Sequence, residues 1–86
     1  MSKSHWSLEI AYEPKFYPAL DEKIDKIVGR DHNGSGMGFG ARDLNYDFKT
    51  DADARAIGKR VKRLEGIKTV RVQFWDGNDW SKEETL

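Results

Sequence analysis

The stretch Arg42–Trp75, RDLNYDFKTDADARAIGKRVKRLEGIKTVRVQFW, decides the fold class of this chain. Near each end of the stretch, apolar and polar residues alternate with a period of two, which is typical of a strand with one buried face. The apolar positions of these two expected strands are Leu44, Tyr46, Phe48, Val70, Val72 and Phe74. Between them, apolar residues recur at helical spacing. The stretch therefore predicts a strand, a helix and a second strand.

The signals at both ends of the expected helix agree with its apolar stripe. Thr50 or Asp51 supplies an N-cap, and Gly66 follows the stripe, where a left-handed residue is needed. The stripe consists of Ala54, Ile57, Val61 and Leu64. We expect its last three members to be nearly fully buried against the two strands. Strands joined by a helix of this length are normally parallel, with a right-handed crossover.

The N-terminal third of the chain repeats this logic. A first strand is indicated by alternating apolar residues at Trp6, Leu8, Ile10 and Tyr12. An amphipathic helix then starts near Pro18, where proline is well tolerated, and Gly29 is placed to end it. The apolar residues of this helix are Leu20, Ile24, Ile27 and Val28.

Residues 29–41 form a glycine-rich segment. Met37 and Phe39 are odd-numbered, whereas the apolar positions of the following strand are even-numbered, so one regular strand cannot bury both sets. A turn or bulge at 40–42 resolves the conflict, and the segment is expected to be a short edge strand in a hairpin. Its glycines, spaced by two, would leave one side bare, where a phosphate or another backbone can approach.

The order of the expected elements is β-α-β-β-α-β. This order resembles the split βαβ arrangement of the ferredoxin-like fold, which implies an α+β two-layer sandwich over nearly the whole chain. If the glycine-rich segment is a loop instead, a three-stranded βαβαβ sandwich remains. The resemblance carries no functional residues, because this fold hosts many unrelated activities.

The 86 residues leave room for a single domain, 1–86, with an ordered core at about 5–76 and a tail at 77–86. We expect the end of the tail, 81–86, to be frayed. The chain has no cysteine, which excludes disulfides and thiolate metal sites. Its polar N-terminus and its lack of long apolar runs predict neither a secretory signal nor a membrane span, so we expect a cytoplasmic protein.

No sequence motif points to a metal, a cofactor or a catalytic group. Asp43, Asn45 and Asp47 superficially resemble a calcium loop, but the invariant glycine is replaced and the three residues spread along a strand. The glycine spacing matches neither a dinucleotide fingerprint nor a Walker loop. His32 can act as an acid or base, yet no nucleophile accompanies it. An enzyme or nucleotide binder using 29–41 is therefore the last of three hypotheses.

Positive charge is concentrated in the expected second helix, at 54–65. Its basic residues are Arg55, Lys59, Arg60, Lys62 and Arg63. They suggest, as the second hypothesis, binding to a nucleic-acid backbone, whereas the alternative is a solvated helix face. Nucleic-acid binding through the sheet is disfavoured, because its central strands present carboxylates and no aromatic residue to a phosphate chain.

The first hypothesis is a small non-enzymatic protein-binding module. An inhibitor, an immunity or anti-defence protein, an adaptor or a homodimer would have these features. The expected contact surface is the uncovered face of the sheet, because such faces are often used for pairing. The residues assigned to it are Glu9, Asp43, Asn45, Asp47, Arg71 and Trp75. The glycine-lined edge near Met37 and Phe39 is a further candidate, since an edge strand can accept an added strand.

Overall fold

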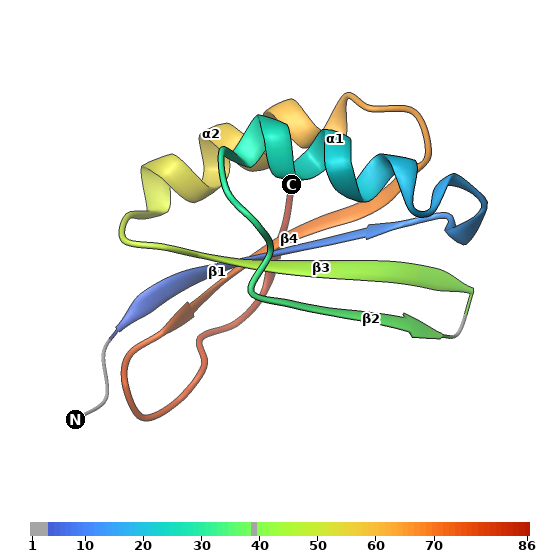
Figure 1. Ribbon diagram of the computed structural model, residues 1–86. Helices are drawn as coiled ribbons and strands as arrows, with labels where there is room; N and C mark the ends of the chain where they lie inside the picture. The colour runs from blue at the N-terminus through green and yellow to red at the C-terminus, as the bar shows by residue number, and fades with distance from the viewer. Residues whose placement is uncertain (1–3, 39) are drawn as a thin grey trace.

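The computed structural model describes residues 4–38 and 40–86, which form a two-layer α+β sandwich. Within these residues, five strands make one antiparallel sheet, and two α-helices cover the same face of it (Figure 1). The strands are β1 (His5–Tyr12), β2 (Gly34–Gly38), β3 (Ala41–Phe48), β4 (Ile67–Trp75) and β5 (Glu84–Thr85), and the helices are α1 (Ala19–Val28) and α2 (Asp51–Lys62). The α+β class expected from the sequence is confirmed. None of the described helices is long and apolar enough to cross a membrane.

The strands follow one another across the sheet in the order β2-β3-β1-β4-β5. Because β1 pairs antiparallel with both β3 and β4, those two strands point the same way but are separated by β1. The connection through α2 therefore crosses over one strand. The four-stranded order expected from the sequence is not confirmed as it stands, because β5 follows β4 and extends the sheet at that edge.

The core lies between the helices and the sheet, and the predicted alternation holds along three strands. The fully or nearly fully buried strand residues are Leu8, Ile10, Tyr12, Leu44, Tyr46, Val70 and Val72. The prediction for α2 is partly wrong: Val61 is buried, but Ile57 and Leu64 are only half-buried at the margin of the core. The helix instead turns Ala54, Gly58 and Val61 to the sheet. A glycine at the centre of this face lets the helix and its neighbours approach closely.

The start of α2 and the end of α1 follow their sequence signals, but the expected end of α2 at Gly66 is wrong, because α2 is capped by Arg63 in the right-handed region. The Thr50 side chain accepts a hydrogen bond from the backbone N–H of Asp53 at 3.2 Å, which confirms the N-cap of α2. Gly29 ends α1 in the left-handed region, at φ 90°. Gly66, at φ 94°, lies in the turn before β4, where an added Cβ would come within 2.6 Å of Cε2 of Phe16.

The glycine-rich segment forms a strand, so the loop alternative is wrong. Gly34–Gly38 pairs with β3, and Gly38 lies opposite Ala41 across a tight turn in which Gly40 has φ 77°. The expected hairpin is therefore confirmed. Met37 is 51% exposed rather than buried, because the strand lies at the edge of the sheet. Phe39, the other residue expected there, lies outside the described residues.

The tail is paired with the sheet at Glu84–Thr85, whereas the sequence predicted a frayed end at 81–86. Glu84–Thr85 pairs with β4, and the backbone N–H of Leu86 donates to the carbonyl oxygen of Val70 at 2.8 Å. The Leu86 side chain packs against the core. Figure 1 shows the tail rising beside β4 towards the helices.

Candidate functional site

The open face of the sheet, which is the face opposite the helices, collects the polar side chains of β1, β3 and β4. Glu9 lies directly between Asn45 and Arg71, and Ser7 lies between Asp47 and Gln73 in the neighbouring row. The six residues assigned to this face from the sequence all lie on it: Glu9, Asp43, Asn45, Asp47, Arg71 and Trp75. Their role in binding stays a prediction.

Negative charge exceeds positive charge on the open face, even after its ion pairs are counted. The guanidinium of Arg71 lies 3.3 Å from a Glu9 carboxylate oxygen and 3.6 Å from one of Glu83. His5 Nε2 lies 3.4 Å from a carboxylate oxygen of Asp47. One arginine is thus shared by two carboxylates, while Asp43 and Asp47 add further negative charge.

An aromatic cluster lies at one end of the open face. The Trp75 and Trp80 rings lie 5.0 Å apart between centroids, and the His5 ring meets Trp80 edge-on at 5.8 Å. Hydrogen bonds hold the segment that carries Trp80, since the N–H of Ser81 donates to the Phe74 carbonyl at 2.8 Å. Trp80 is still 45% exposed. A large aromatic surface is thus offered to a partner beside the carboxylates.

Between the aromatic cluster and the charged rows lies a hollow of about 200 Å³. It is lined by Ser7, Glu9, Asn45, Arg71, Gln73, Trp80 and Glu83. The two tail residues among these were not assigned to the open face from the sequence. Trp80 had a signal, because the turn dipeptide at 76–77 lies between two tryptophans and indicates that the chain folds back. Glu83 had none, because its place depends on the pairing of β5.

The Asp43 carboxylate occupies the side of β2 that the glycines would otherwise leave without side chains. A Cβ added at Gly36 would lie 2.8 Å from Oδ1 of Asp43, so the Asp43 side chain lies over this glycine. A phosphate approaching here would meet a like charge. This arrangement removes the main argument for a nucleotide site in 29–41.

The basic residues of α2 are only partly free to bind an anion. Arg55 donates to Asp51 at 2.6 Å and lies 2.7 Å from a carboxylate oxygen of Glu84. Lys62 donates to the backbone carbonyl of Leu86. Lys59, Arg60 and Arg63 are exposed. The five residues therefore do not act as one uncommitted cationic surface.

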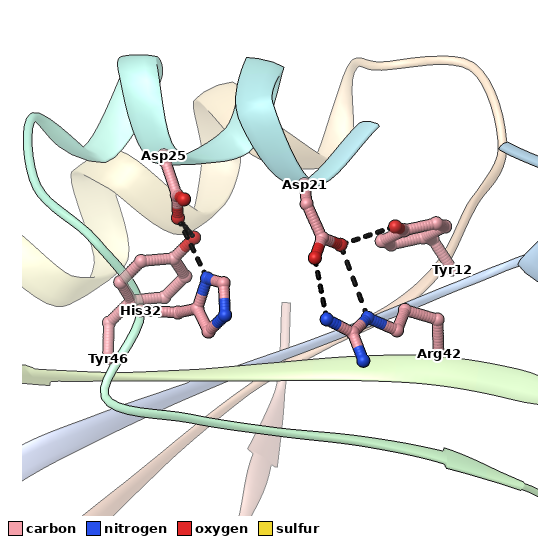
Figure 2. Close-up of polar contacts among 6 residues, drawn as sticks. All are labelled: Tyr12, Asp21, Asp25, His32, Arg42 and Tyr46. Carbon is pink, nitrogen blue, oxygen red and sulfur yellow. Dashed lines mark hydrogen bonds and ion pairs between the residues drawn. The ribbon is translucent and has the colours of Figure 1, made fainter. Parts of the chain in front are cut away.

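Two polar clusters between α1 and the sheet were missed in the sequence analysis, and Figure 2 shows both. In the first, Asp21 accepts hydrogen bonds from the Tyr12 hydroxyl and from Arg42, whose Nη2 lies at 2.6 Å. Asp21 is 8% exposed. Burial alone would raise the pKa of Asp21, but the hydrogen bonds from Arg42 and Tyr12 and the guanidinium charge together lower it. Burial and the bond to Asp21 raise the pKa of Tyr12.

In the second cluster, Asp25 accepts a hydrogen bond from the Tyr46 hydroxyl at 2.6 Å and contacts His32 Nδ1 at 3.2 Å. Burial, followed by the hydrogen bond to Asp25, raises the pKa of Tyr46. His32 therefore has an orienting carboxylate, which comes from α1 and not from the adjacent Asp31. Within the described residues, no hydroxyl other than that of Tyr46 hydrogen-bonds to this pair. The cluster connects α1 to the sheet through hydrogen bonds, and it does not have the arrangement of a nucleophile with its general base.

The first cluster makes the stability of the fold depend on pH. The pKa of Asp21 is lower in the folded chain than in the unfolded chain, where such a carboxyl has a pKa of about 3.9. Its stabilisation is therefore fully present above that pH and is lost as the pH falls through the lowered folded pKa. We expect the free energy of unfolding, measured by urea titration at a series of pH values, to fall below about pH 4. An equal fall in Asp21→Asn would contradict this assignment.

No three His, Cys, Asp or Glu side chains come together in a metal-binding arrangement in the part of the chain that the structure describes. Comparisons with known protein families, curated proteins and solved structures found no match to this chain.

Proposed function

We propose that this chain is a small non-enzymatic protein-binding module whose open face binds a basic segment of a partner protein. The observation that carries the proposal is the half-exposed Trp80 beside a hollow of about 200 Å³ on an acidic face. Carboxylates attract lysine and arginine side chains, and an indole ring adds a favourable surface for a guanidinium or an aliphatic stem. All of these groups are brought together from three strands and the tail.

The charge on the open face favours a basic partner over a second copy of the chain. Arg71 is already paired with Glu9 and Glu83, so it offers little to an opposing carboxylate. Two open faces pressed together would place like charges opposite one another, which costs free energy. A face-to-face homodimer is therefore an outcome that the experiment below separates from the proposal.

We also propose that the fold is the ferredoxin-like βαββαβ arrangement with β5 added at one edge. The succession β1-α1-β2-β3-α2-β4 and the sheet order β2-β3-β1-β4 support this assignment. The fifth strand is the departure from it. The uncovered sheet face then follows from the two-layer architecture, in which both helices pack on one side.

The double variant Asp43→Lys, Asp47→Lys tests the binding surface. The probe is a short fluorescein-labelled peptide of alternating arginine and glycine, and a glutamate–glycine peptide serves as its counterpart. We expect fluorescence polarisation to show binding of the arginine peptide, weakened about tenfold or more in the variant, which corresponds to about 1.4 kcal/mol. Both side chains are on the open face, so circular dichroism should show an unchanged fold.

A matched pair of reversals at exposed residues outside the open face, Glu22→Lys in α1 with Glu65→Lys in the turn before β4, changes the net charge equally. This control should bind the arginine peptide almost as well as the natural chain. Equal loss in both variants would reduce the effect to net charge and contradict the proposal. A natural chain that is dimeric by light scattering, and monomeric after the Asp43 and Asp47 reversals, would assign the face to a second copy instead.

A further inference from the structure

The end of the tail lies along the edge of β4, with Glu84 and Leu86 on the side of α2 and Glu83 on the side of the open face. The space between α2 and β4 that residues 84–86 fill is called the groove. Thr85 lies opposite Arg71, Glu84 lies opposite Val72, and the N–H of Leu86 donates to the carbonyl of Val70 at 2.8 Å. Without the tail, β4 would present unpaired backbone donors and acceptors at the edge of the sheet. The groove therefore binds an extended strand through its backbone.

The floor of the groove has a notch that admits a leucine side chain. Gly58 of α2 is buried, and a Cβ added to it would come within 3.1 Å of Cδ1 of Leu8 and of Cγ1 of Val70, and closer still to Cδ1 of Leu86. Glycine is a poor residue for the interior of a helix. Its presence at this point leaves room for the Leu86 side chain against the core.

Two cations of α2 fix the polar parts of the same strand. Nη2 of Arg55 lies 2.7 Å from a carboxylate oxygen of Glu84, and Asp51 holds this arginine in place at 2.6 Å. Lys62 donates to the backbone carbonyl of Leu86. Because alternate side chains of a strand point to the same side, an acid and a leucine two positions later both face α2.

We infer that this groove is a strand-acceptor site for an extended acidic–any–leucine segment of a partner protein, and that the chain's own Glu84–Leu86 occupies it as an internal competitor. Addition of a strand to a sheet edge is an established mode of peptide recognition, in which pockets for alternate side chains supply specificity. Here the notch at Gly58 selects leucine, and Arg55 selects the acid.

The internal competitor is attached weakly enough for a free strand to displace it. The paired strand is two residues long, and the Glu84 side chain is 61% exposed. Exposed ion pairs add little stability, so the seating of Leu86 is the main attachment. A tethered competitor acts at an effective concentration of about millimolar, so weakening it should strengthen binding of a free strand.

The test uses the full chain and a fluorescein-labelled peptide of its own sequence 81–86, Ser-Lys-Glu-Glu-Thr-Leu. The variant Glu84→Ala, Leu86→Ala weakens the internal competitor. We expect it to bind the peptide about tenfold or more tightly than the natural chain does. Peptides with lysine in place of the second glutamate, or alanine in place of leucine, should bind about tenfold more weakly.

Charge reversal in α2 tests the selectivity of the groove. Arg55→Glu, made in the chain that also carries Glu84→Ala and Leu86→Ala, should no longer bind the peptide of sequence 81–86. It should bind the lysine-substituted peptide more tightly instead. Arg60→Glu is the matched control, because this exposed residue of the same helix forms no hydrogen bond or ion pair with the described tail residues 81–86, and it should keep the natural preference. Equal binding of all three peptides, or no binding by a folded tail-weakened chain, would overturn the inference.

If the tail-weakened chain does not fold, the natural chain decides the question. Millimolar peptide should shift the backbone amide signals of 70–72 in nuclear magnetic resonance spectra, and unmoved signals would refute the site. Light scattering distinguishes the source of the strand. A monomeric complex of chain and peptide supports binding of a partner's segment. If the natural chain is instead a dimer that the peptide converts to monomers, the groove binds the tail of a second copy, and the inference is contradicted.

Discussion

Asp21→Asn is expected to lower the free energy of unfolding by about 3–5 kcal/mol, measured by urea titration followed by tryptophan fluorescence. The substitution leaves the Arg42 guanidinium, whose side chain is 12% exposed, without its carboxylate partner. It also weakens the hydrogen bond from the Tyr12 hydroxyl. The cost arises mainly from an unpaired charge in a poorly solvated place, and not from the loss of a favourable pair.

Two further variants make the Asp21 result specific. Glu22→Gln removes a neighbouring carboxylate that is exposed in the same turn of α1, and it should cost less than about 0.5 kcal/mol. Asp21→Leu combined with Arg42→Met removes both charges, and it should recover most of the stability lost in Asp21→Asn. A loss below about 1 kcal/mol for Asp21→Asn would show that Arg42 is well solvated and needs no partner.

Leu44→Ala should cost about 2–5 kcal/mol in the free energy of unfolding, because it empties a site at the centre of the core. Leu44 is 0% exposed, whereas Leu64, a residue of the same size, lies half-buried at the margin. The matched variant Leu64→Ala should therefore cost clearly less, since solvent and neighbouring side chains fill its place. Equal losses for the two variants in urea titration would show that α2 packs on the sheet with a different face.

The local elements of the fold were predictable from the sequence, and the tilt of α2 was not. The period of two and the helical period depend only on backbone geometry, so they indicated the strands and helices directly. The stripe of α2 was placed one residue too far to one side, because Gly58 carries no hydrophobic signal and was not counted as a contact. Burial of a glycine follows from close packing, which is not encoded in the local pattern.

The candidate site was predictable to the extent that it lies on regular strands. Parity along β1, β3 and β4 is sufficient to place Glu9, Asp47 and Arg71 on one face, and the register brings them together. The pairing of Arg71 with Glu83 was not predictable, because a two-residue strand has no periodicity to detect. If β5 is left out, Glu83 is not counted on the open face, and the face is then less acidic than it is in the structure.

The sequence by itself determined the α+β class, the N-cap of α2, the glycine that ends α1, the hairpin at Gly40 and the faces of the three long strands, because each of these follows from interactions within a few residues. The tertiary structure alone decided the contacts between distant segments. It joined Asp21 to Arg42 and seated Leu86 beside Gly58. Such contacts depend on how helices and tail settle on the sheet, and that is set by the packing of the whole core.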